Sequence, residues 1–224
     1  MANLPTQKSR ILIVDDHPLF REGMQQMIDR NASLEVCGEA SSPAAAMKAV
    51  AALEPDMVLV DISLEGGDGI DLIKNLKEKH ENLPILVISM HNESLYAERA
   101  LRAGALGYVM KNEAARVVKA AILKVLGGDI FLSEKMSASV LARLMHGRNE
   151  LPVSPVEQLS DRELQVFQML GEGKTSRQIA EELELTIPTI HSFRNRIKEK
   201  LKFQNATELV LGANQWVLER PAKL

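Results

Sequence analysis

The sequence predicts two domains: an α/β domain with a doubly wound sheet of five parallel strands, and a small all-α domain of four helices. Two observations lead to this prediction. Short apolar runs alternate with helical segments as far as residue 128, which is the pattern of a parallel sheet covered on both faces. From Leu159 onward only compact helical segments follow. A chain of 224 residues has room for two domains of ordinary size.

Four of the five predicted strands are apolar runs of four residues, and a polar residue follows each run directly. They are ILIV (11–14), MVLV (57–60), ILVI (85–88) and GYVM (107–110), and a fifth, less apolar strand is expected over 34–39. Runs this short are typical of strands buried on both faces. Helices with apolar residues on one face are expected between and after the strands, over 17–30, 43–53, 68–80, 94–102 and 113–126.

A linker is predicted over residues 129–157, between the α/β domain (9–128) and the helical domain (158–224). It contains one amphipathic helix, 133–146, with Ser133 as its cap, and then a stretch with two prolines and no periodicity. Ser160 and Glu163 form a capping-box pattern at the start of the helical domain. The four helices of that domain are expected over 161–171, 176–183, 187–202 and 206–218.

The composition excludes several classes of protein. Hydrophobic residues make up 46% of the chain and charged residues 25%, which is ordinary for a globular protein and argues against disorder. The single cysteine, Cys37, cannot form an internal disulfide. No apolar run approaches the roughly 18 residues that span a bilayer, and the N-terminus lacks the apolar segment of a signal peptide. The expectation is a cytoplasmic protein without a membrane partner.

Residues able to do chemistry follow four of the predicted strands. They are Asp15 and Asp16, then Asp61, Ser89 and Lys111. The carboxyl ends of parallel strands lie at one edge of a sheet, so these side chains should converge in one cleft. Neighbouring carboxylates repel each other, and a hard cation such as Mg²⁺ relieves that repulsion. An aspartate beside such a cation, an ammonium and a hydroxyl can attack phosphorus, so the pattern predicts a phosphoryl and metal site.

The motifs VDDHP, VDISLEGGDGI, ISMH and GYVMK resemble, in order and spacing, the receiver domain of two-component response regulators. The resemblance covers residues 9–128 and implies a flavodoxin-like fold and a sensor histidine kinase as partner. It also implies that the domain catalyses only its own phosphorylation and dephosphorylation. The implied residues are Asp61 as phosphoacceptor, Asp16, Asp61 and the Ser63 main-chain carbonyl as ligands of Mg²⁺ or Mn²⁺, Asp15 as support for the metal, Lys111 at the phosphoryl oxygens, and Ser89 and Tyr108 as a switch pair. His91, in the loop after Ser89, is predicted to have no role.

The charge of the helical domain is concentrated in one helix. Residues 1–130 contain 14 Lys and Arg against 18 Asp and Glu, whereas residues 156–224 contain 10 of each. Within the latter, residues 188–202 hold five basic residues and one acidic residue. A local basic patch of this kind suits a polyanion, although a solvated helix face has the same composition.

The segment LSDRELQVFQMLGEGKTSRQIAEELELTIPTIHSFRNRIKEKL resembles the LuxR-type output domain of the NarL/FixJ class of response regulators. The resemblance covers residues 158–219 and implies a helix-turn-helix that binds double-stranded DNA. On the basic helix, Ile190, Phe193, Ile197 and Leu201 should face the core. The DNA-binding residues implied are His191, Ser192 and Asn195 at bases, Arg194 and Lys198 at phosphates, Lys174, Ser176 and Arg177 as further phosphate contacts, and Thr189.

The last helix carries a continuous apolar stripe. In the family that this segment resembles, the helix forms the contact of the DNA-bound dimer, so a homodimer is expected when the chain is phosphorylated or bound to DNA. The alternative is that the stripe packs in the core of its own domain. The stripe consists of Leu209, Val210, Ala213, Trp216 and Val217.

Together these observations predict a DNA-binding transcription regulator that phosphorylation of Asp61 activates. One alternative is an aspartyl-nucleophile phosphohydrolase. Such an enzyme would carry its nucleophile on the first strand in a DxD pattern, whereas this chain has adjacent Asp15 and Asp16 there. The other alternative is a DNA-binding regulator that does not depend on phosphorylation, which the complete acidic set argues against.

Overall fold

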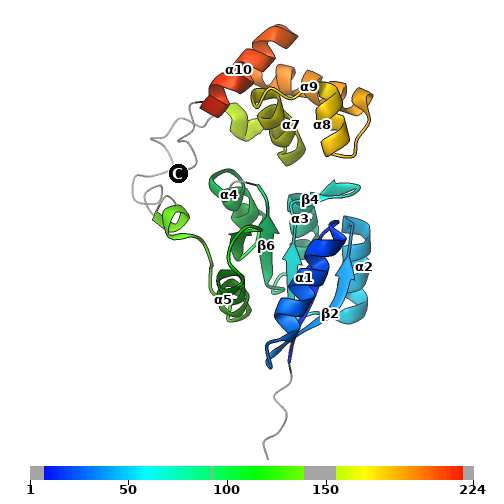
Figure 1. The fold of residues 1–224 in the computed structure, drawn as a ribbon, viewed down its shortest axis with the longest axis vertical. Coiled ribbons are helices and arrows are strands. Elements are labelled where there is room, and N and C mark those ends of the chain that lie inside the picture. Colours follow the sequence, from blue (N-terminus) through cyan, green and yellow to red (C-terminus); the bar gives the residue numbers. More distant parts are fainter. Residues whose placement is uncertain (1–7, 92, 139–154, 219–224) are drawn as a thin grey trace, which may run out of the picture. The chain divides into compact units, whose positions relative to one another are not determined.

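The computed structural model describes residues 8–91, 93–138 and 155–218. The chain divides into two compact units, with the boundary between Arg148 and Asn149 (Figure 1). No helix in the described ranges is long and apolar enough to cross a membrane.

The first unit is built on a five-stranded sheet of β1 (Ser9–Val14), β2 (Leu34–Ala40), β3 (Met57–Val60), β6 (Ile85–Ser89) and β7 (Gly107–Met110). The spatial order is β2-β1-β3-β6-β7, and every neighbouring pair is parallel. This is the flavodoxin-like order, in which connections leave β1 toward opposite sides and ligands bind outside the carboxyl ends of the strands. The predicted doubly wound sheet is confirmed.

Five helices cover the sheet, each beginning and ending within two residues of the predicted limits. Their starts follow local rules. Ser42 accepts a hydrogen bond from the Ala45 main-chain N–H and caps α2, and proline occupies the first turn of both α1 and α2. The helices are α1 (Pro18–Asp29), α2 (Pro43–Leu53), α3 (Gly69–Lys79), α4 (Glu93–Ala103) and α5 (Ala115–Leu126).

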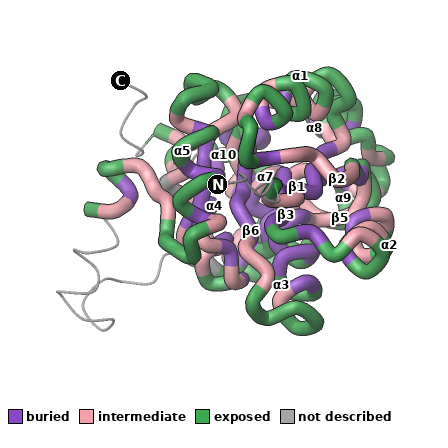
Figure 2. The backbone as a smooth tube through the Cα atoms, turned by 90° about the horizontal axis from the view of Figure 1, so that it is seen from below, coloured by how far each residue is buried: buried purple, intermediate pink, exposed green. Residues whose placement is uncertain are grey.

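The core of the first unit lies on both faces of the sheet. Ile11 and Ile13 of β1 pack with Ile28 of α1 and Ile122 of α5, so α1 and α5 share one face. Alternate strand residues such as Leu12 point to the opposite face and are equally buried. Figure 2 shows the central strands buried along their length. Because both faces are buried, the strand sequences are continuous apolar runs rather than alternations of apolar and polar residues.

A hairpin after β3 was not predicted. It consists of β4 (Ser63–Leu64) and β5 (Gly67–Asp68), which pair in antiparallel fashion. Gly66 in the turn has a φ of +74°, a conformation that favours glycine. Strands of two residues contain too few positions to show a periodicity, so no sequence pattern predicted them. The hairpin fixes the position of Ser63, beside Asp61.

The close approach of Gly69 to the loop after β3 leads to a testable prediction. A Cβ atom on Gly69 would overlap the main-chain carbonyl oxygen of Asp61. We therefore expect Gly69→Ala to destabilise the first unit by about 1–3 kcal/mol, because the backbone must shift. Gly23, with nothing within 4 Å of its added Cβ, is the matched control. Thermal unfolding measures both variants, and equal melting temperatures would contradict the prediction.

The predicted linker begins in ordered structure. Phe131 forms a β-bridge with Gly107, and its carbonyl accepts a hydrogen bond from the Tyr108 N–H at 3.0 Å. The sheet domain therefore extends past residue 128, which corrects the predicted boundary. Ser133 caps a helical segment at 134–138, accepting from the Met136 N–H at 3.1 Å. The rest of the predicted helix, and of the linker as far as residue 154, lies outside the described residues.

The second unit is helical and matches the predicted limits closely. Ser160 and Glu163 form the predicted capping box. Burial tends to raise the pKa of Glu163, but hydrogen bonds from Lys200 and Ser160 outweigh it and lower that pKa. The Phe167 ring packs on the rings of Phe203 and Trp216. The elements are a 3-10 turn, η1 (Pro155–Gln158), and the helices α7 (Asp161–Gly171), α8 (Ser176–Glu182), α9 (Ile187–Leu201) and α10 (Ala206–Leu218).

Candidate functional site

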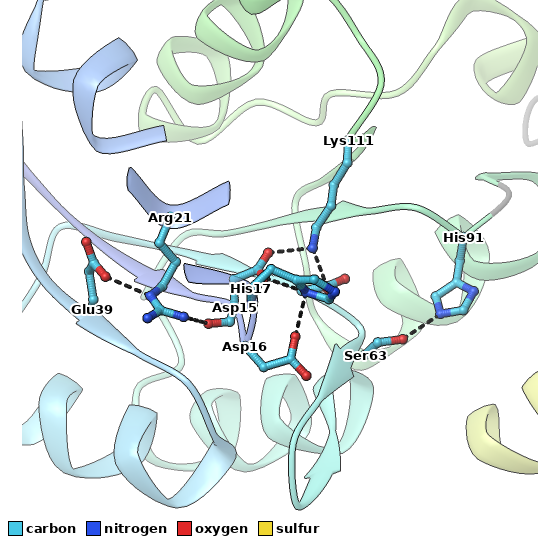
Figure 3. Close-up of polar contacts among 9 residues, drawn as sticks. Asp15, Asp16, His17, Arg21, Glu39, Ser63, His91 and Lys111 are labelled. Carbon is cyan, nitrogen blue, oxygen red and sulfur yellow. Dashed lines mark hydrogen bonds and ion pairs between the residues drawn. The ribbon is translucent and has the colours of Figure 1, made fainter. Parts of the chain in front are cut away.

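An acidic pocket lies at the carboxyl edge of the sheet. Asp15 follows β1, Asp61 follows β3 and Lys111 follows β7. The Lys111 Nζ lies 2.6 Å from Asp15 Oδ2 and 2.7 Å from Asp61 Oδ2, and at most 5% of each side chain is exposed. Figure 3 shows Lys111 directed at the Asp15 carboxylate. Residues up to 96 positions apart in sequence thus meet because parallel strands end at one edge.

The pocket has the donor set of a divalent cation site. One ligand atom from each of Asp15, Asp16, His17 and Asp61 can be chosen so that all lie within 4.8 Å of one another. The Oδ1 atom of Asp61 is buried and has no hydrogen-bond donor among the residues that the structure describes. A buried carboxylate oxygen without a donor is costly unless a cation or another donor binds there. Oxygen donors at this spacing fit Mg²⁺ or Mn²⁺.

The pKa of Asp61 reflects its burial and its charged neighbours. Burial raises the pKa of the Asp61 carboxyl, the Lys111 ammonium lowers it, and the Asp15 charge raises it again, with a net upward shift. The ammonium of Lys111 therefore compensates the acidic pocket only in part. A divalent cation would favour the ionised form of Asp61, which is the nucleophilic form.

Two residues that the sequence did not single out support the pocket. The Arg21 guanidinium donates to the Asp15 main-chain carbonyl at 2.6 Å and to Glu39 at 2.7 Å, which fixes the loop after β1 (Figure 3). The Phe20 ring lies 4.5 Å from the Lys111 Nζ, in cation–π geometry. Both lie on the first turn of α1, where the sequence shows only helical periodicity.

The expected switch pair is buried and linked through His91. Ser89 and Tyr108 are at most 1% exposed. The Tyr108 hydroxyl donates to the His91 carbonyl at 2.8 Å, and the His91 N–H donates to Ser89 Oγ at 3.3 Å. His91 Nε2 also hydrogen-bonds to Ser63 Oγ at 2.7 Å (Figure 3). These contacts of His91 join the hairpin after β3 to the expected switch pair, so the residue has structural partners that the sequence did not show.

Helix α9 presents the expected faces. Ile190 and Ile197 are fully buried, while His191, Ser192 and Asn195 are exposed. Phe193 and Leu201, also expected in the core, are only half-buried, and Lys198 is half-buried as well. The hydroxyl of Thr189 lies 2.8 Å from that of Thr186, the cap of α9, so Thr189 has a local structural role.

Four of the expected phosphate contacts are engaged in the protein itself. Arg194 donates to Ser176 Oγ at 2.6 Å and so joins α9 to α8. Arg177 pairs with Glu181 at 3.1 Å. Lys174 pairs with Glu182 at 2.7 Å, and although burial lowers the pKa of Lys174, the bond to Glu182 outweighs it and raises the pKa. Acidic residues of α8 thus pair with two of the expected phosphate contacts, Lys174 and Arg177.

The structure places part of the expected dimer stripe on α10 in the core of the second unit. Leu209 and Ala213 are fully buried, and Trp216 packs on Phe167 at 5.3 Å between ring centroids. Val217 lies against Gly171 of α7. Leu209 and Ala213 thus belong to the core of their own unit, and Trp216 and Val217 are half-buried against it, because the apolar face of a helix packs first against its own domain. Whether the stripe also forms a dimer contact stays a prediction. The exposed apolar residues of α10 are Val210, Leu211 and Leu218.

Comparison with known proteins identifies both units. Residues 11–123 match the family described as response regulator receiver domain, and residues 157–213 match bacterial regulatory proteins of the luxR family. The transcriptional regulatory protein LiaR of Bacillus subtilis is 33% identical over 207 residues, which cover 92% of this chain and 97% of LiaR. The nitrate/nitrite response regulator protein NarL of Escherichia coli is 28% identical over 93% of this chain and 96% of NarL.

Solved structures extend the similarity to proteins bound to DNA. RcsB from Salmonella enterica serovar Typhimurium, bound to promoter rprA in the presence of the phosphomimetic BeF3−, superposes with a TM-score of 0.59. It is 25% identical and covers 93% of this chain and 99% of its own. A structure of two RcsB dimers bound to two parallel DNAs gives a TM-score of 0.56 at 26% identity, over 92% of this chain and 99% of its own.

Proposed function

This chain is a response regulator of the NarL/FixJ class, with a receiver domain followed by a LuxR-family DNA-binding domain, and we propose that phosphorylation of Asp61 controls its binding to DNA. One observation carries the proposal. Asp61 is a buried carboxylate with one oxygen on Lys111 and the other without a donor in the described structure. A sensor histidine kinase would supply the phosphoryl group, and the chain would act on promoter DNA in the cytoplasm.

The proposed chemistry is one phosphoryl transfer per activation. A carboxylate oxygen of Asp61 forms a bond to phosphorus as the bond from phosphorus to the kinase imidazole nitrogen breaks, and the Lys111 ammonium stabilises the charge on the phosphoryl oxygens. A bound Mg²⁺ or Mn²⁺ would add positive charge there. Asp16, Asp61 and the Ser63 carbonyl would hold that ion, with Asp15 in support. Hydrolysis of the acyl phosphate returns Asp61, so the chain modifies only itself.

The proposed switch starts from the hydrogen bonds around His91. A phosphoryl group on Asp61 offers three oxygens that can accept a hydrogen bond from the Ser89 hydroxyl. When Ser89 turns toward it, the bond from the His91 N–H to Ser89 Oγ is lost, and the bond from Tyr108 to the His91 carbonyl is loosened. Tyr108 can then repack, which changes the surface that the receiver domain presents.

We propose α9 as the helix that enters the major groove of DNA. Its exposed His191, Ser192 and Asn195 carry the donors and acceptors that read base edges, whereas its basic residues contact phosphates. Two copies of so small a module bind paired half-sites far more tightly than one does. We therefore propose a homodimer on DNA, with the exposed apolar residues of α10 as its contact.

The ion pair between Lys174 and Glu182 gives a prediction for DNA affinity. We expect Glu182→Gln to strengthen binding to any DNA sequence, because it removes the nearer of the two carboxylates that pair with Lys174 and makes the lysine more available to a phosphate. The slope of log affinity against log salt should steepen by about one. Fluorescence anisotropy at several salt concentrations measures this. Glu65→Gln, an equal charge change at an exposed receiver residue, is the control, and an equal gain there would contradict the local explanation.

Selection of bound genomic DNA fragments tests the proposed function. The full chain is incubated with fragments in the presence and absence of beryllofluoride, which mimics an aspartyl phosphate. We expect specific fragments to be enriched more strongly with beryllofluoride. Equal enrichment under both conditions would refute control by phosphorylation and favour a regulator that does not depend on it. Absence of enrichment under both would refute specific DNA binding.

A further inference from the structure

His17 lies at the rim of the acidic pocket, and the mechanism above does not use it. Its Nδ1 atom is 2.7 Å from Asp16 Oδ1 and 3.1 Å from Asp15 Oδ1. Figure 3 shows the imidazole ring over these two carboxylates. The side chain is 64% exposed, so the ring can adjust its position without disturbing the core.

The backbone explains why the ring is directed there. His17 is the N-cap residue of α1, and its extended conformation is the one that a residue before proline adopts. Its main-chain N–H donates to Asp15 Oδ1 at 2.9 Å, which closes a tight turn. The imidazole makes no capping hydrogen bond to α1. The ring is therefore not used to start the helix and remains over the carboxylates.

The spacing of the donor atoms fits a shared metal ion. Ligands at about 2.1 Å from one ion lie at most roughly 4.2 Å apart, and the ligand atoms of Asp15, Asp16, His17 and Asp61 lie within 4.8 Å. Small adjustments of these four side chains would close the difference. The second, independent sign of a ligand is Asp61 Oδ1, a donor-free oxygen on a side chain that is only 3% exposed.

We propose that His17 Nδ1 is a ligand of the divalent cation in this pocket. The inference rests on the proposed function, in which the pocket holds such an ion. A nitrogen ligand favours Co²⁺, Ni²⁺ and Zn²⁺, whereas Mg²⁺ prefers oxygen. This receiver domain therefore selects nitrogen-binding ions over Mg²⁺ more strongly than the oxygen ligands of the site would alone.

Calorimetric titration of the full chain with Mg²⁺, Co²⁺ and Ni²⁺ tests the selectivity at one fixed, mildly alkaline pH. His17→Ala removes the nitrogen without removing a helix cap. We expect this variant to bind Co²⁺ and Ni²⁺ about tenfold or more weakly, while Mg²⁺ affinity changes little. His80→Ala, at the exposed end of α3, should change neither. Equal weakening of all three ions would overturn the proposal, because it indicates a structural role for His17.

Pulsed electron paramagnetic resonance of the Mn²⁺-loaded chain tests the bond directly. We expect nitrogen modulation from a coordinated imidazole in the parent, and no such modulation in His17→Ala. Mn²⁺ bound without nitrogen modulation in the parent would overturn the role of His17 and leave the acidic metal site intact. Failure of the parent to bind any divalent ion would overturn the metal site itself, together with this inference.

Discussion

Lys111→Met is expected to lower the free energy of unfolding of the receiver domain by about 3–5 kcal/mol, because it leaves two buried carboxylates without their cation. Methionine keeps an apolar chain over the Phe20 ring, so loss of packing contributes little. Hydrogen exchange of the β1 and β3 amides measures the effect in this domain alone. Added Mg²⁺ should restore more stability to the variant than to the parent, since the ion replaces the lost charge.

Lys119→Met is the matched control for this prediction. It makes the same substitution at an exposed position of α5, where changes of less than about 0.5 kcal/mol are expected. A loss in Lys111→Met no larger than in Lys119→Met would contradict the interpretation of Lys111 as the charge that holds the pocket together. Equal rescue of both variants by Mg²⁺ would contradict it as well.

The second large effect is expected from Asp61→Asn. An amide has no anionic oxygen to attack phosphorus, so incorporation of labelled phosphoryl groups from a small phosphodonor should fall from a full equivalent to background. The fold should persist. Burial raises the pKa of Asp61, which means that the site disfavours the charged form, and a neutral amide should not lower the melting temperature.

Asp71→Asn, at an exposed position of α3, should incorporate label as the parent does. Label retained by Asp61→Asn would show that another residue accepts the phosphoryl group. The phosphohydrolase alternative has a separate signature. Steady turnover of a generic phosphate ester that Asp61→Ala leaves undiminished would favour it over a phosphorylation switch.

Local chemistry made most of the fold predictable. A serine at a helix start acts within one turn, so the capping-box pattern of Ser160 and Glu163 indicated a helix limit that the structure reproduces. The apolar strand runs are continuous because both faces of the sheet are covered. The hairpin at 63–68 and the edge contact of Phe131 could not be found in this way. The two hairpin strands are too short to show a periodicity, and Phe131 is a single residue that pairs with Gly107 of β7.

The candidate site likewise contains residues that could be predicted from the sequence and residues that could not. Asp61 and Lys111 were identifiable because strand ends share one edge whatever the side chains are. The contacts of His91 and the position of the His17 ring could not be identified from the sequence, because each depends on the path of a loop. The pairing of Arg194 with Ser176 likewise joins two helices whose approach no spacing encodes.

The sequence by itself determined the order of strands and helices, the acidic edge of the sheet and the basic helix, because periodicity and capping are properties of neighbouring residues. The tertiary structure alone decided which partners those residues have. An apolar stripe such as that of α10 indicates only that one face of the helix is buried. Whether the same domain or a second copy covers that face depends on contacts between residues distant in sequence, here those of Trp216 with Phe167.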